Sequence, residues 1–106
     1  MNDFVKDLKL DRIIHERARL LILTIIAKRP DKKIGFNELK EISQLTSGNL
    51  SVQLKNLEEA NYLKINKTFK DKRPYTEIEL TQTGKLALEN YLDEVEKIIK
   101  IYRGEV

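Results

Sequence analysis

Two alternating segments separated by a basic stretch constrain the fold of this 106-residue chain more than any other feature. Apolar and polar residues alternate over residues 63–69, and they alternate again over residues 76–81. A period of two is typical of β-strands that bury one face, so the pair predicts a β-hairpin. The tip of the hairpin would be the stretch Lys70-Asp71-Lys72-Arg73-Pro74-Tyr75, which its proline would stiffen.

This predicted hairpin is strongly basic. Between residues 64 and 76 five basic residues stand against one acid, so the segment carries +4 (five minus one), more than the +3 of the whole chain. The basic residues are Lys64, Lys67, Lys70, Lys72 and Arg73. Phosphate oxygens supply most nucleic-acid affinity, so the segment favours contact with a nucleic-acid backbone. The alternative is a solvated hairpin whose lysines only discourage pairing with other strands.

A helix is predicted immediately before the hairpin, from Thr46 to about Ala60. Thr46 is a good N-cap, because its hydroxyl can accept a hydrogen bond from the backbone of Gly48 or Asn49. The stripe that would face the core consists of Leu50, Leu54 and Leu57. The opposite face carries mainly small and polar residues, which are Gly48, Asn49, Val52, Lys55, Asn56 and Glu59.

That opposite face suits contact with the edges of DNA bases. An exposed Val52 can touch a thymine methyl group, while asparagine and glutamine side chains can pair with adenine. An ordinary solvated helix face is the alternative, and the helix alone favours neither interpretation.

The first third of the chain predicts a scaffold for these elements. Dense apolar residues over 10–28 indicate a central helix, and a break near His15-Glu16 would split off a short leading helix. Pro30 ends the central helix. A short bridging strand is expected at residues 33–35, a second helix at about 37–43, and a tight turn at 43–45.

The last quarter predicts one long helix from Gln82 onward, capped by Thr81. Its apolar stripe is longer than one small domain easily covers, and we expect it to pack against a second copy, together with Phe4, Val5 and Leu8. The predicted dimer residues are Leu88, Tyr91, Leu92, Val95, Ile98, Ile99 and Tyr102. The alternative is a helix folded back on its own core.

The whole pattern resembles the small winged-helix transcriptional regulators of bacteria and archaea, close to the MarR and ArsR groups. The stretches that carry the resemblance are residues 19–23, 36–39, 45–51 (Leu-Thr-Ser-Gly-Asn-Leu-Ser), 54–63 and 72–76 (Lys-Arg-Pro-Tyr-Thr), and it covers roughly residues 10 to 100. It implies an α+β, mainly α fold, a winged helix-turn-helix with a two- to three-stranded wing sheet and a long C-terminal helix. We expect a single domain over residues 1–106, with a core over about 10–81 and a dimerisation helix over about 82–103.

The resemblance also implies which residues contact DNA. The helix after the turn would lie in the major groove, and the wing would lie on the adjacent backbone or minor groove. The helix residues are Thr46, Ser47, Gly48, Asn49, Ser51, Val52, Gln53, Lys55 and Asn56. The wing residues are Lys67, Lys70, Lys72, Arg73 and Tyr75. Asn61 replaces a glycine found in many relatives, but asparagine tolerates the left-handed conformation that the helix end needs.

Other chemistry is scarce in the sequence. There are no cysteines, and the lone His15 has no partner histidine at metal spacing, so we expect no metal site, no cofactor and a structural His15. Neighbouring carboxylates such as Glu58-Glu59 diverge on a helix, so we expect no catalytic site and no enzyme. The chain lacks a signal-peptide pattern and a long apolar run, which predicts a cytoplasmic protein without membrane association.

The sequence therefore predicts a homodimeric, sequence-specific regulator that binds double-stranded DNA. One alternative is a winged-helix module that binds protein, or a chromatin-like factor that binds nucleic acid without sequence preference. Another is a sensor with a pocket for a small-molecule effector between the central and C-terminal helices, as MarR-like proteins often have.

Overall fold

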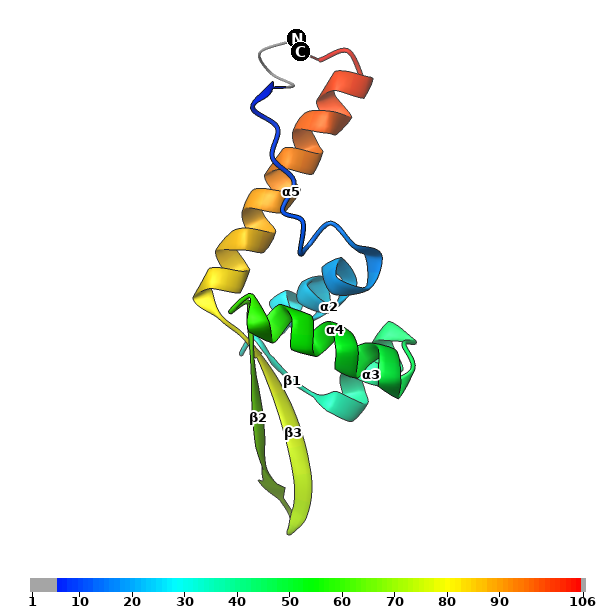
Figure 1. Cartoon of the computed structure of the whole chain (residues 1–106), viewed down its shortest axis with the longest axis vertical. Coiled ribbons are helices and arrows are strands. Elements are labelled where there is room, and N and C mark those ends of the chain that lie inside the picture. The colour runs from blue at the N-terminus through cyan, green and yellow to red at the C-terminus, as the bar shows by residue number, and fades with distance from the viewer. Residues whose placement is uncertain (1–5, 106) are drawn as a thin grey trace.

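The sheet of this protein contains three antiparallel strands in the order β1-β3-β2, and the helices gather at one end of it (Figure 1). The computed structural model describes residues 6–105. Its elements are, in chain order, α2 (Arg17–Lys28), β1 (Lys33–Gly35), α3 (Phe36–Ser43), α4 (Ser47–Glu59), β2 (Leu63–Lys70), β3 (Arg73–Leu80) and α5 (Gln82–Tyr102). The predicted winged helix-turn-helix with a long C-terminal helix is confirmed.

The core forms around α2. Ile22, Leu23 and Ile26 of this helix join one cluster of buried side chains, to which β1, β2, β3, α3, α4 and α5 all contribute. A helix surrounded in this way needs apolar residues over most of its circumference, which explains its dense apolar sequence. The predicted central helix is confirmed, and the Arg29-Pro30 stretch follows its last residue, Lys28.

The predicted leading helix before α2 is wrong. Residues 12–14 form a single turn, because the Asp11 carboxylate accepts hydrogen bonds from the backbone N–H groups of Ile13 (2.8 Å) and Ile14 (3.0 Å). Asp11 therefore acts as an N-cap, and His15 N closes one helical turn by donating to Asp11 O at 2.8 Å, but the turn is not continued. The chain then extends at Glu16, whose carboxylate caps α2 by accepting from Arg19 N (2.8 Å).

The helix-turn-helix consists of α3, a short turn and α4. Gln44 ends α3 in the left-handed conformation with φ of 61°. Thr46 caps α4 as predicted, since its hydroxyl accepts from Asn49 N at 3.1 Å. The predicted core stripe of α4 is confirmed, because Leu50, Leu54 and Leu57 are all buried.

The end of α4 turns sharply into β2. Asn61 adopts φ of 64°, as expected for a residue that replaces glycine at a helix end, and Tyr62 N donates to Leu57 O at 3.0 Å. The Tyr62 hydroxyl donates to the Asp11 carboxylate, and burial together with this hydrogen bond raises the pKa of Tyr62 to about 12. The junction therefore links α4 and β2 to the segment that precedes α2.

The wing is longer and its turn shorter than predicted. β2 and β3 pair from Leu63 and Leu80 out to Lys70 and Arg73, so the turn is only Asp71 and Lys72, both with positive φ. The predicted six-residue tip is wrong, because Arg73 and Pro74 belong to β3. Proline is tolerated there since β1 pairs only with Glu77, Ile78 and Glu79, which leaves the edge of β3 free at Pro74.

α5 follows the sheet and extends away from the wing (Figure 1). Leu88 and Tyr91, both predicted to meet a partner, are buried in the core of the chain itself, and Val95 packs against that core. His15 Nδ1 lies 2.9 Å from the Tyr91 hydroxyl, which fits the structural role expected of the histidine. Phe4 and Val5 lie outside the described residues.

We predict that Gly84→Ala destabilises the fold by about 1–3 kcal/mol, the usual cost of overpacking. A Cβ at Gly84 would lie 2.9 Å from the carbonyl carbon of Tyr62 and would overlap its oxygen. Gly48→Ala is the matched control, because a Cβ there meets no atom within 4 Å and alanine favours a helix. Urea unfolding measures both variants, and equal stabilities would contradict the close packing at Gly84.

Candidate nucleic-acid interface

The helix residues predicted to contact DNA are Thr46, the N-cap of α4, and residues on the sides of α4 outside its buried stripe of Leu50, Leu54 and Leu57. Gln53 and Asn56 are partly buried. The others are exposed, namely Thr46, Ser47, Gly48, Asn49, Ser51, Val52 and Lys55. Val52 exposes 56% of its surface although it is apolar. Ser47 and Gly48 lie in the first turn of the helix, where backbone N–H groups without an intrahelical partner attract anions.

Two of these side chains are joined to an arginine that the sequence pattern did not single out. Arg19 Nη1 donates to Gln53 Oε1 at 2.8 Å, and Gln53 Nε2 donates to Asn49 Oδ1 at 3.0 Å. Arg19 belongs to α2 and is 34 residues from Gln53 along the chain. No local pattern marks such a tertiary contact, so sequence periodicity could not have found it.

The wing divides its predicted contact residues between two faces. Alternation places Lys67 and Phe69 on the face of the buried Ile78, towards α4, together with Pro74. Lys64, Lys70, Arg73 and Tyr75 lie on the opposite face, and Lys72 lies in the turn. The positive charges therefore surround the hairpin and do not form one patch.

A depression of about 360 Å³ connects α4 with the wing. Its lining residues come from α3, α4, β2 and β3, and they are Phe36, Ser51, Leu54, Ile65, Lys67 and Thr76. Exposed Ser51 and Lys67 thus border the same depression. The helix face and the inner face of the wing form one continuous surface.

Tyr75 lies opposite Thr68 in the wing, three residues after the turn residue Lys72. A Cβ on Gly35 would lie 3.0 Å from two ring atoms of Tyr75, so the ring lies over the backbone of β1. Lys70 Nζ lies 5.1 Å from the centroid of the same ring, within range of a cation–π interaction. Tyr75 is therefore placed to orient Lys70.

Phe69 is a second residue that the sequence pattern did not single out. It exposes 74% of its surface near the end of the wing and pairs with Pro74 across the strands. The alternating pattern implied a buried position, but the hairpin extends past the helices that cover its base (Figure 1). An exposed aromatic ring among lysines is a surface that could contact sugars or bases in a groove.

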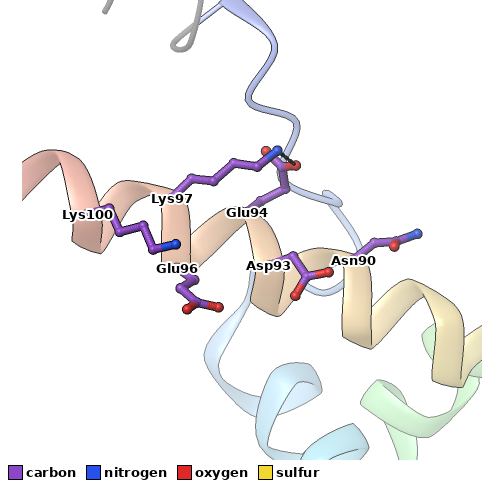
Figure 2. A pocket seen from close by; sticks show the side chains of 6 residues that line it. All are labelled: Asn90, Asp93, Glu94, Glu96, Lys97 and Lys100. Atoms are coloured by element: carbon purple, nitrogen blue, oxygen red, sulfur yellow. Dashed lines mark hydrogen bonds and ion pairs between the residues drawn. The ribbon is translucent and has the colours of Figure 1, made fainter. Parts of the chain in front are cut away.

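Two other depressions adjoin α5. The first, about 490 Å³, is lined by one face of the helix (Figure 2), and its residues are Asn90, Asp93, Glu94, Glu96, Lys97 and Lys100. Lys97 Nζ lies 2.9 Å from Glu94 Oε1, and this hydrogen bond raises the pKa of Lys97 and lowers that of Glu94. Its three carboxylates outnumber two ammonium groups, so phosphate would be repelled there.

The second depression, about 380 Å³, lies beside the expected effector position. Its residues are Lys9, Asp11, Tyr62, Thr83, Leu86, Ala87, Asn90 and Tyr91, so it lies between α5 and the segment before α2.

Among residues 6–105, no helix is long and apolar enough to cross a bilayer. The same residues contain no group of three or more side chains suited to hold a metal ion.

Comparison with known proteins relates this geometry to a family. Residues 18–99 match the family described as winged helix DNA-binding domain. An uncharacterized protein of Methanocaldococcus jannaschii is 40% identical over 65 residues, which cover 61% of this chain and 71% of that protein.

Solved structures share the fold. A transcriptional regulator homologue from Pyrococcus horikoshii is similar with a TM-score of 0.78 and 25% identity, covering 92% of this chain and 95% of that chain. A MarR family transcriptional regulator from Streptomyces coelicolor, solved in complex with DNA, has a TM-score of 0.71 at 19% identity, covering 99% of this chain and 73% of that chain.

We predict that Lys72→Gly is more stable than Lys72→Ala by roughly 1 kcal/mol, because glycine adopts positive φ without strain. Lys72 has φ of 66°, at a turn position where glycine is usual. Both variants lose the same charge, so urea unfolding of the pair isolates the backbone term. Equal stabilities would contradict the assigned turn geometry.

Proposed function

The chain belongs to the family of winged helix DNA-binding domains, and we propose that it is a homodimeric transcriptional regulator that binds double-stranded DNA sequence-specifically. The observation that carries the proposal is that the exposed part of α4 is continuous with the inner face of the hairpin through Ser51 and Lys67, while the hairpin segment carries a net charge of +4 spread over both of its faces. The solved complex of the Streptomyces coelicolor regulator with DNA gives the fold a precedent for this use.

In the proposal, α4 lies in the major groove, which is wide enough to admit a helix. Val52 would touch a thymine methyl group, while Asn49 and Gln53 would contribute to reading base edges. Ser47, Gly48 and the N-terminal turn of α4 would approach phosphates with their backbone N–H groups. The buried stripe of Leu50, Leu54 and Leu57 holds this face outward.

The wing would lie in the neighbouring minor groove. A hairpin in a groove has a phosphate strand on each side, and the wing carries Lys67 on one face and Lys70 and Arg73 on the other. Lys72 in the turn and the exposed Phe69 ring would enter the groove. Both outer edges of the hairpin are free near the turn, because β2 is an edge strand and β1 pairs with β3 only at Glu77, Ile78 and Glu79, so the salt dependence of DNA binding separates the proposal from lysines that only protect a strand edge.

We predict that the protein binds duplex DNA with an affinity that falls steeply between about 50 and 200 mM salt. The double change Lys72→Ala and Arg73→Ala should flatten the salt dependence by about one unit for each phosphate that the variant no longer neutralises. Fluorescence anisotropy of a labelled duplex pool measures both. Lys100→Ala is the matched control, since it removes an exposed charge from the distant α5.

The outcomes separate the alternatives. A sequence-specific reader loses its preference among duplexes when Val52 or Asn49 becomes alanine. A chromatin-like binder loses DNA affinity only when the wing residues are changed. For a protein-binding module, neither the helix changes nor the wing changes alter the DNA affinity. Absence of binding at low salt would contradict the proposal for the unliganded protein.

α5 is the proposed dimer interface. The apolar stripe that is buried at Leu88 and Tyr91 continues along the same side of the helix beyond the body of the protein, where it is exposed. The exposed residues of this stripe are Leu92, Ile98, Ile99 and Tyr102, the last with 91% of its surface exposed. A two-fold pair of such helices would cover these side chains and match a two-fold operator.

We predict that the double change Ile98→Glu and Ile99→Glu converts the protein from a dimer to a monomer, because it places charges in the covered stripe. Sedimentation equilibrium at micromolar concentration measures the mass. Lys100→Glu, on the opposite side of α5, should remain dimeric. A monomeric mass for the unchanged protein would contradict this interface.

A further inference from the structure

Arg19 is held in a fixed position between α2 and α4. Its Nε donates to Ile13 O at 2.5 Å, its Nη1 donates to Gln53 Oε1 at 2.8 Å, and Nη1 also lies 3.9 Å from Glu16 Oε2. Only 17% of the side chain is exposed. A guanidinium bound at two points in this way has little freedom to turn.

The chemistry of arginine fixes the orientation of the two amides that follow. Arginine has donors and no acceptor, so the Gln53 amide must turn its oxygen towards Arg19. The Gln53 Nε2 group then points towards Asn49, four residues earlier in α4, and donates to Asn49 Oδ1 at 3.0 Å. Asn49 is exposed, and its Nδ2 group keeps two hydrogens for an outside partner.

We infer that Arg19 and Gln53 are positioning residues that make Asn49 a hydrogen-bond donor towards DNA. The base at this position would present acceptors to the major groove, as guanine does with N7 and O6 and thymine does with O4, and cytosine N4 would be disfavoured. The inference rests on the proposed placement of α4 in the major groove. It goes beyond that placement because it states which partner donates the hydrogen bond at Asn49 and which accepts it.

Val52 indicates which base lies next to the one that Asn49 would contact. It lies three residues after Asn49, so the two side chains are neighbours on the exposed face of α4. A donor beside an exposed valine suits a step in which an acceptor-bearing base adjoins a thymine methyl group. If the hydrogen bonds from Arg19 to Gln53 and from Gln53 to Asn49 only stabilised the packing of α2 on α4, changing them would not alter the base preference.

Gln53→Glu is the sharpest test. Glutamate can still accept from Arg19 but cannot donate, so the Asn49 amide must turn to donate to it and would present Oδ1 to DNA. After an operator has been selected with the unchanged protein, anisotropy is measured on duplexes that carry each of the four base pairs at the position sensitive to Asn49→Ala. The ratio of affinities is compared, because the added negative charge weakens all duplexes alike.

The expected result is a preference of roughly tenfold for an acceptor base in the unchanged protein. Asn49→Ala should abolish this preference, and Gln53→Glu should shift it towards a donor base. Gln53→Met, which has similar length and no amide, should flatten it. Arg19→Lys keeps the charge but loses the guanidinium fork, and it should also weaken the preference while leaving the salt dependence unchanged.

Each other outcome is decisive. If Asn49→Ala abolishes the preference while Gln53→Glu, Gln53→Met and Arg19→Lys leave it unchanged, the inference is wrong and the proposed function survives. If Asn49→Ala weakens all duplexes equally, Asn49 contacts phosphate and the inference is again wrong. If the unchanged protein has no preference at any position, the proposed function fails first. Should Gln53→Glu not fold by circular dichroism, Arg19→Lys and Gln53→Met decide between these outcomes.

Discussion

The close contact between Gly84 and the backbone of Tyr62 determines how α4, the wing and α5 lie relative to one another. Only a residue without a Cβ allows α5 to begin so near to the carbonyl of Tyr62. The same carbonyl accepts from Thr81 N at 3.1 Å, and Tyr62 N donates to Leu57 O. The end of α4, the start of β2 and the start of α5 therefore meet at one residue.

This junction gives the molecule two separate ends. The wing extends from one end and the second half of α5 from the other (Figure 1), along a molecule 57 Å long and 24 Å wide. The basic hairpin and the exposed face of α4 are thus remote from the uncovered apolar stripe of α5. A dimer formed through α5 would leave both proposed DNA-binding surfaces free, which is why the two parts of the proposal are compatible.

Much of this arrangement could be predicted because it follows from local periodicity. The period-two segments predicted the hairpin, and Thr46 with Leu50, Leu54 and Leu57 predicted α4 and its buried side. The predictions that were wrong failed because of backbone conformation and tertiary packing. The extended backbone at Glu16 limited the leading helix to a single turn, the two strands of the hairpin paired past Pro74, and Leu88 and Tyr91 joined the chain's own core. The contact of Arg19 with Gln53 has no sequence signature at all.

A map of backbone amide chemical shifts, recorded as a selected duplex is added to the protein, tests the proposed DNA-binding surface residue by residue. We expect the largest changes within residues 46–56 and 67–75, the exposed face of α4 and the end of the wing. Smaller changes should follow at Arg19, which contacts Gln53. Changes concentrated in α5, with residues 46–56 unaffected, would contradict the proposed surface.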